Sequence, residues 1–446
     1  AVFFKSEFLK FAEILKNCGI FRMEVRLKRL LKKSFFAVFA VVFAFSAFAK
    51  GSKEYVTQEI NASERCLPVF YENIKSRWTF KMGYKDGVDF NQWKKDGLEK
   101  ARELIIQEDD KTPFDMVVLE SEKRDGYTAQ KVVFNISQDS RVLAYLLVPN
   151  GKKGQTFPAA LMLHDHGSNF AIGKEKMVRA FSSDKAVEKI LKIKSNKEAS
   201  IEAAKLSPES KNLYEKIKNS KAWANQYFSD LYPGDELAKR GYVVLSFDAL
   251  GWGDRSVKNF STGSQQSLAS NMFNMGTSFA GLIAQEDCRA AKFLASLPQV
   301  DKERVACIGF SMGGFRSWQL AAISDDIKAG VSVCWFGTMK GHIVEKDGQL
   351  KGNSAYSMLH PTMAKFLDYP DIAGLAAPKP MYFIGGDKDA VNPNAGTEEA
   401  YEKVHKIWTA ANAGDKVKTE IVPGMEHAFP AEQQKAAFDW LDKQFK

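Results

Sequence analysis

A serine in a glycine-bounded pentapeptide is the residue of this chain best placed to act as a nucleophile. Residues 309–313 read Gly-Phe-Ser-Met-Gly, a G-x-S-x-G pattern centred on Ser311. The β-prone run Val305–Ile308 precedes it, and Phe315–Ile323, which has no Gly or Pro, follows as an expected helix. A strand, a tight turn and a helix in this order lift a serine hydroxyl above a sheet, where it can attack a carbonyl carbon.

A serine hydroxyl needs a base to take its proton, and the chain offers 6 histidines. His427 lies in the Gly- and Pro-bounded loop 423–430, between the strand-like run Thr419–Val422 and the expected last helix. We therefore predict His427 as the base. The remaining histidines lack this setting: His164, His166, His342, His360 and His405.

The base in turn needs a carboxylate that holds its tautomer. The strand-like run Met381–Ile384 leads into Gly-Gly-Asp-Lys-Asp-Ala-Val-Asn-Pro at 385–393, which contains two acids. Asp389 fits a G-x-x-D-x-x-x-P turn and is the predicted acid. Asp387 is the alternative; if Asp389 is the acid, we expect Asp387 to form a turn by bonding nearby backbone.

Acyl transfer also needs two backbone N–H groups for the negative charge that develops on the carbonyl oxygen. The amide of Met312, directly after the nucleophile, is one predicted donor. The second is the amide of Ser168, in the loop 164–168 (His-Asp-His-Gly-Ser) that follows the apolar run Ala159–Leu163. Only backbone groups are needed, so these side chains can vary.

Substrate contacts are predicted at His166 and Gly167 of that loop and at Trp252. Trp252 belongs to the loop 248–255, for which a purely structural turn around Asp248 is the alternative reading. The sequence has no C-x-x-C pair and no H-E-x-x-H motif. We therefore expect neither a metal nor a cofactor.

Hydrophobic patterning places these residues on an α/β domain. Residues 113–148 alternate as an antiparallel β-meander, and apolar strands then alternate with helical segments, which predicts a doubly wound, mostly parallel sheet. We expect a helical wrap at 50–112 and the catalytic domain at 113–446. A helical insertion at about 174–233 is too long for one connection and is read either as a solvated hairpin or as a lid over the serine.

Composition describes an ordinary globular protein of 446 residues, with 45% hydrophobic and 26% charged residues. The net charge of +9 is concentrated in the first 49 residues, so nucleic acid is not an expected partner. From Met23, a basic stretch, a short apolar run and Ala47-Phe48-Ala49 predict a signal peptide at 23–49, with residues 1–22 as a leader outside the natural protein. The apolar run is shorter than the ~20 residues of a membrane anchor, so we expect export to the periplasm or outside the cell.

Together the motifs resemble one branch of the α/β-hydrolases, the dienelactone hydrolases and acetyl xylan esterase-like proteins. The resemblance spans roughly 113–446 and rests on these segments: 163–167, 246–255, 309–314, 385–393 and His427. It implies ester hydrolysis, often of acyl groups on plant polysaccharides. Two features depart from the branch: the insertion is unusually long, and Ser311 stands where dienelactone hydrolases proper use Cys, which argues against that lactone chemistry.

The sequence thus predicts an exported serine esterase that acts on carboxylic esters, with O-acetyl groups on carbohydrate as the first choice. A prolyl-oligopeptidase-like peptidase shares the triad but would normally bring a propeller, and no blade repeats occur at 50–150. A non-catalytic binding protein on the same fold is the third reading.

Overall fold

The structure is a computed structural model that describes residues 72–446, except 107–109, 183, 345–355 and 393. All of the described residues belong to one compact unit. The predicted leader and signal peptide therefore lie outside the described residues. Within the described part, none of the helices combines the length and apolar character needed to span a bilayer.

A nine-stranded sheet forms the centre of this unit, in the order β1-β2-β3-β5-β4-β6-β7-β8-β9. Its first three strands are antiparallel, β3 pairs antiparallel with β5, and the strands from β5 to β9 are parallel. The predicted doubly wound, mostly parallel sheet with antiparallel strands at its start is confirmed. The strands are β1 Val117–Arg124, β2 Tyr127–Ser137, β3 Ser140–Pro149, β4 Phe157–Leu163, β5 Val243–Phe247, β6 Val300–Phe310, β7 Ala329–Val333, β8 Met381–Gly386 and β9 Val417–Val422.

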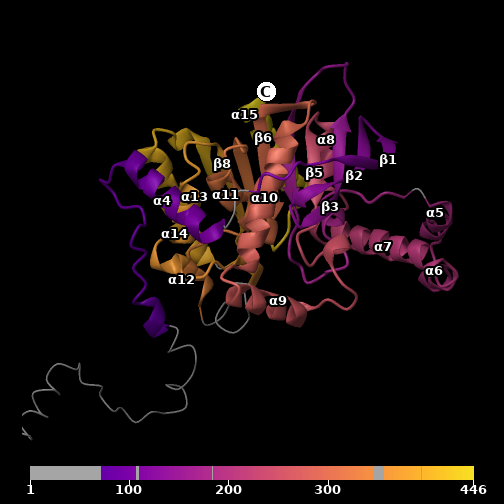
Figure 1. Ribbon diagram of the computed structural model, residues 1–446, viewed down its shortest axis with the longest axis horizontal. Coiled ribbons are helices and arrows are strands. Elements are labelled where there is room, and N and C mark those ends of the chain that lie inside the picture. The colour runs from indigo at the N-terminus through magenta and orange to yellow at the C-terminus, as the bar shows by residue number, and fades with distance from the viewer. Residues whose placement is uncertain (1–71, 107–109, 183, 345–355, 393) are drawn as a thin grey trace, which may run out of the picture. The chain divides into compact units, whose positions relative to one another are not determined.

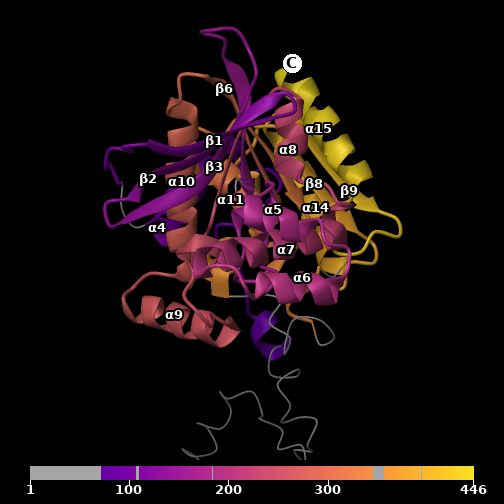
Figure 2. The same ribbon diagram turned by 90° about the vertical axis from the view of Figure 1, so that its right-hand side faces the viewer.

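Helices cover both faces of the sheet, as Figure 2 shows for α4 and α10 on one side and α8 and α15 on the other. The helices are α4 Phe90–Ile105, α5 Lys185–Leu191, α6 Asn196–Ala203, α7 Pro208–Phe228, α8 Pro233–Lys239, α9 Thr262–Asn274, α10 Phe279–Ser296, α11 Met312–Ile323, α12 Met339–His342, α13 Tyr369–Gly374, α14 Asn394–Ala410 and α15 Ala431–Phe445.

Strand alternation divides the core into two layers. In β4, Ala159 and Leu161 point into the layer under α10 and α11, whereas Ala160 and Met162 point into the layer under α8 and α15. All four side chains are fully buried, so the central strand is apolar on both faces. That is the pattern of a parallel sheet covered on both sides.

The N-terminal part packs onto this domain through α4 (Figure 1). Asp89 caps the helix by accepting the backbone N–H of Gln92, and the buried face of the helix, including Ala101 and Ile105, joins the core layer of α10. A Cβ built on Gly97 would lie 2.7 Å from a methyl group of Leu375, so this helix approaches its neighbour closely.

The segment between β4 and β5 contains α5, α6 and α7. Its outer part has a small core of its own, which includes Val187, Ala199 and Tyr214. Figure 1 shows α5 and α6 away from the sheet, with α7 leading back toward it. The C-terminal end of α7 enters the main core through Trp223 and Phe228. One end of the insertion is therefore fixed to the sheet.

Candidate active site

Ser311 sits in a strained turn between β6 and α11. Its backbone angles, φ 55° and ψ −122°, are rare for a residue with a side chain. The flanking glycines leave no space for a Cβ: one on Gly309 would lie 2.0 Å from the Gly313 carbonyl oxygen, and one on Gly313 would lie 1.9 Å from the Leu163 carbonyl oxygen. The strand and the helix can approach this closely only with glycine at both positions.

Three side chains from distant parts of the chain form a continuous hydrogen-bonded relay at this turn. His427 Nε2 lies 2.9 Å from Ser311 Oγ, and His427 Nδ1 lies 2.9 Å from Asp389 Oδ2. A carboxylate can accept a hydrogen bond but has no proton to donate. In the neutral imidazole the proton is therefore assigned to Nδ1, and Nε2 accepts a hydrogen bond from the serine hydroxyl. The arrangement has the geometry of a nucleophile, its base and an orienting acid.

The two candidate acids have different partners. Asp389 follows β8 and is held by its other oxygen, Oδ1, which accepts the backbone N–H groups of Val391 and Asn392 at 2.8 and 3.1 Å. Asp387 instead accepts the backbone N–H of Gly424 at 2.6 Å, on the loop that follows β9. The structure therefore brings Asp389 to His427 and uses Asp387 to join two loops.

The imidazole of His427 is packed from one side by Phe310, the residue before Ser311. The two rings are 4.9 Å apart between centroids. Phe310 is itself packed against Tyr227 and Phe228 of α7, and the carbonyl of Tyr227 accepts the N–H of Phe429 in the histidine loop. The end of α7 thus supports the loop that contains His427.

The two predicted oxyanion donors differ in their surroundings. Met312 is the first residue of α11, so its amide is among the first-turn N–H groups that lack an intrahelical partner. The amide of Ser168 donates to His166 Nδ1 at 3.1 Å, and His166 Nε2 in turn lies 2.9 Å from Gln265 Oε1. His166 is therefore engaged at both ring nitrogens, while Gly167 and Ser168 are exposed.

Buried charges fix the loop that contains Ser168. Lys176, wholly buried, donates through Nζ to the backbone carbonyls of Asp165 and His166, both at 3.0 Å, and to the Asp165 carboxylate at 3.2 Å. Trp223 of α7 donates to the same carboxylate at 3.0 Å. Lys176 and Trp223 belong to the insertion read from sequence as a solvated hairpin or a lid, so its two ends are structural supports of the loop.

Trp252 does not have the predicted role in substrate stacking. Its side chain is fully buried, packed against Phe170 and Phe279, and its indole N–H donates to the His166 carbonyl at 3.0 Å. A Trp in a Gly-rich turn can fold inward, and this one does so. The loop 248–255 is instead a structural turn around Asp248. The Asp248 carboxylate accepts hydrogen bonds from the backbone N–H and from Nζ of Lys174, each at 2.7 Å.

A comparison with models of known protein families shows which family the relay-containing part of the chain matches. Residues 229–443, which include the serine, the acid and the histidine of the relay, match the dienelactone hydrolase family. These residues form a dienelactone hydrolase family domain, and the sheet with its covering helices has the α/β-hydrolase fold. This α/β-hydrolase is also 24% identical over 306 residues to the protein named "Putative hydrolase YtaP" of Bacillus subtilis (strain 168), covering 69% of this chain and 85% of that one.

Solved structures share the fold. A "putative acetyl xylan esterase" of Bacteroides fragilis NCTC 9343 superimposes with a TM-score of 0.59 at 15% identity, over 81% of this chain and 84% of that one. A glucuronoyl esterase from Solibacter usitatus gives 0.54 at 14% identity, over 82% and 97%. At such identities the likeness establishes a common architecture for this α/β-hydrolase.

A fully buried thiol lies beside the relay of this α/β-hydrolase. Cys334 follows β7 directly, and its backbone N–H donates to Ile384 of β8 at 2.8 Å. Its Sγ donates to the Ala428 carbonyl at 3.3 Å. Burial, together with the nearby Asp389 carboxylate, raises the pKa of the Cys334 thiol well above its usual value. No sequence signal marks this contact, because strand register creates it.

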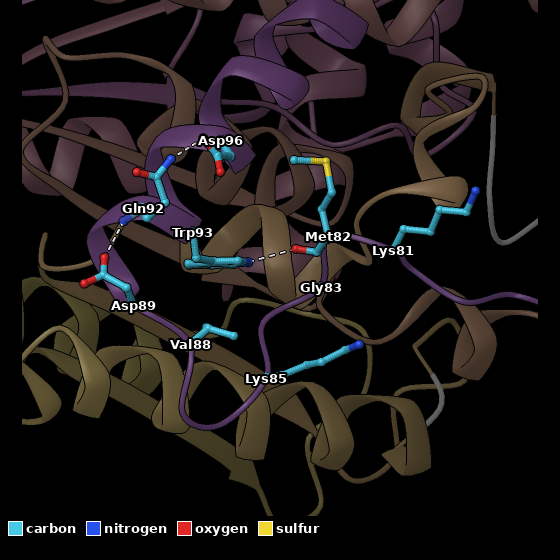
Figure 3. Close-up of a pocket in the computed structure, with 9 residues that line it drawn as sticks. All are labelled: Lys81, Met82, Gly83, Lys85, Val88, Asp89, Gln92, Trp93 and Asp96. Carbon is cyan, nitrogen blue, oxygen red and sulfur yellow. Dashed lines mark hydrogen bonds between the residues drawn. The ribbon is translucent and has the colours of Figure 1, made fainter.

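A separate hollow at the start of α4 has a different character (Figure 3). It has a volume of about 380 Å³ and contains Trp93, whose indole N–H donates to the Met82 carbonyl at 2.8 Å. None of its 9 lining residues is a Ser, Cys or His. This hollow therefore offers no serine, thiol or imidazole for nucleophilic attack on an ester.

Proposed function

We propose that this α/β-hydrolase is a serine esterase that cleaves carboxylic esters, with O-acetyl or similar acyl groups on carbohydrate as its substrates. The observation on which the proposal depends is the Ser311–His427–Asp389 relay, with 2.9 Å at each contact, at a strained turn between strand and helix. The names of the structural relatives, acetyl xylan and glucuronoyl esterases, support the carbohydrate ester class.

The first half-reaction transfers the acyl group to the enzyme. As Ser311 Oγ attacks the ester carbonyl carbon, its proton passes to His427 Nε2, and Asp389 stabilises the imidazolium that forms. The carbonyl π electrons move to oxygen, and the amide of Met312 donates to that oxyanion. The Ser168 amide can be the second donor once it leaves His166 Nδ1. When the C–O bond to the alcohol breaks, His427 returns the proton to the leaving oxygen.

The second half-reaction releases the acid. Water gives a proton to His427 Nε2 and attacks the acyl carbonyl carbon, and the same amides hold the second oxyanion. Collapse of this intermediate breaks the bond to Ser311 Oγ, which recovers the proton from His427. Neither half-reaction draws on a metal or a cofactor.

Export to the periplasm or the outside of the cell is part of the proposal, because polymeric carbohydrate esters lie there. Its support is the sequence of residues 23–49, which has the three regions of a signal peptide. Small-molecule or polysaccharide esters are the proposed partners, without nucleic acid or a stable membrane anchor.

A panel of p-nitrophenyl esters, acetylated xylan and a peptide anilide tests the proposal. We expect ester hydrolysis and acetate release, and a loss of at least ~10⁴-fold in kcat in Ser311→Ala. Ser270→Ala is the matched control, because Ser270 is exposed on α9. Cleavage of the anilide but no ester would favour the peptidase reading. A folded protein inert toward every substrate would favour a binding protein.

A further inference from the structure

We propose that Cys334, Asp389 and His427 form an inhibitory site for a thiophilic divalent cation such as Zn²⁺ or Cd²⁺, placed behind the catalytic relay. Sγ of Cys334, a carboxylate oxygen of Asp389 and a ring nitrogen of His427 all lie within 4.8 Å of one another. Thiolate, carboxylate and imidazole are the ligand types that zinc takes in proteins. The inhibitory consequence rests on the proposed function, whereas the binding itself does not.

Strand order produces this cluster. β7 and β8 are parallel neighbours, so the thiol after β7 and the acid after β8 emerge at the same edge of the sheet. The Cys334 thiol donates a hydrogen bond to the Ala428 carbonyl, with 3.3 Å between Sγ and the oxygen. Because Ala428 is the neighbour of His427, this bond holds the third residue of the cluster close to the thiol. The cluster is thus tied together by hydrogen bonds across three loops.

The spacing suits an ion after a small contraction. Zinc bonds of about 2.0–2.3 Å keep neighbouring ligand atoms about 3.5 Å apart. One of the three ligand pairs is already close, since Nδ1 and Oδ2 are separated by 2.9 Å. The side chain of Cys334 is buried and that of Asp389 is 1% exposed, but that of His427 is 20% exposed, so the cluster is not sealed from solvent.

Binding at this position would stop catalysis through the tautomer of the imidazole. The cation takes the Nδ1 lone pair, and the proton on Nδ1 moves to Nε2. The thiol gives its proton to solvent and becomes the thiolate ligand, so one proton is released for each ion bound. An Nε2 that holds a proton donates toward Ser311 and can no longer accept the serine proton. Inhibition therefore needs no contact between the cation and the substrate.

Cadmium titration tests binding without any reference to hydrolysis. In Ser311→Ala, Cd²⁺ should produce a thiolate-to-metal ultraviolet absorption. In the double variant Ser311→Ala/Cys334→Ser, this absorption should be smaller by the amount that one Cd²⁺–thiolate bond contributes. Serine keeps a hydroxyl donor for Ala428 but is a poor ligand for a soft cation. Cys334→Ala is a second variant in case the first is unstable. Equal absorption with and without Cys334 would overturn the proposal.

Inhibition by Zn²⁺ tests the consequence, with each variant compared with its own metal-free rate. We expect chelator-reversible inhibition whose inhibition constant rises at least ~10-fold in Cys334→Ser. Cys288→Ser is the matched control and should leave the constant within about 2-fold, because Cys288 is a free thiol on α10. Equal inhibition in wild type and Cys334→Ser would contradict the proposal. If no ester is hydrolysed, the proposed function fails, but the cadmium result still decides the site.

Discussion

His427 Nε2 lies 2.9 Å from Ser311 Oγ, although 116 positions separate the two residues along the chain. Sheet topology explains the contact. Ser311 follows β6 and His427 follows β9, and these strands belong to one parallel array in which every C-terminal end reaches the same edge. Open α/β sheets place their active sites at that edge.

The choice of acid predicts opposite outcomes for two similar substitutions. Asp389→Asn should lower kcat by about 10⁴-fold, because an amide no longer holds the Nδ1–H tautomer of His427. Asp387→Asn should leave kcat within a few-fold, since its partner is the N–H of Gly424. Steady-state kinetics on a p-nitrophenyl ester measures both. A larger loss in Asp387→Asn would assign the acid to that residue.

The glycines of the nucleophile turn are predicted to be structurally obligatory. A Cβ on Gly313 would lie 1.9 Å from a backbone oxygen, which cannot move like a side chain. Gly313→Ala should therefore lower the free energy of unfolding by at least ~3 kcal/mol, or prevent folding. Gly263→Ala, near the start of α9, is the matched control and should be neutral or stabilise by up to ~1 kcal/mol, because its nearest neighbour is at 3.6 Å. Equal urea midpoints for the two variants would refute the steric argument.

The buried contact between Lys176 and Asp165 should be measurable by a double-mutant cycle. Lys176→Met leaves the Asp165 carboxylate without its cation, which should cost about 3–5 kcal/mol of unfolding free energy and lower kcat by displacing the Ser168 loop. Asp165→Asn together with Lys176→Met should be less destabilised than the sum of the single variants. Additive single-variant effects would show that the pair is not coupled.

The stability of the protein should decrease as the pH is lowered, over a range set by the buried histidine His342. Burial lowers the pKa of His342 to about 4, from about 6.5 when unfolded, with the Asp389 carboxylate opposing the shift. Between these values the unfolded chain binds a proton that the folded chain does not, so stability is lost as the pH falls.

His342→Phe tests this linkage. Phenylalanine keeps the ring stacked on Trp335, and within the described residues neither nitrogen of His342 has a hydrogen-bond partner to lose. We expect denaturant unfolding between pH 6 and pH 4.5 to give an unfolding free energy that changes less steeply with pH in His342→Phe than in wild type. The difference in slope should be about 1 kcal/mol per pH unit. Parallel curves for the two proteins would show that His342 does not titrate on unfolding.

Most of the fold followed from short-range patterns. Apolar runs marked the position of each of the strands, and turn residues separated the antiparallel strands from the parallel ones. The nucleophile turn was readable because its glycines are local to Ser311. The residues of the relay could be predicted because each follows a strand, and parallel strands place such residues at one edge.

Contacts that depend on strand register or on buried charges could not be predicted from the amino-acid sequence in the same way. Lys174 and Lys176 look like solvated residues in a lysine-rich segment, yet both are wholly buried against carboxylates of distant loops. Trp252 was predicted at the substrate, and only the packing of Phe170 and Phe279 around it shows otherwise. The position of Cys334 beside Asp389 depends on the pairing of β7 with β8, which no local motif encodes.

A fluorophosphonate reaction tests the central claim most directly, because the reagent bonds to a serine oxygen only when a base has activated it. Mass spectrometry of the digested protein should find one adduct, on the peptide that contains Ser311, and His427→Ala should slow its formation at least ~10³-fold. Labelling that persists in Ser311→Ala, or a folded wild-type protein that takes no label, would contradict the account.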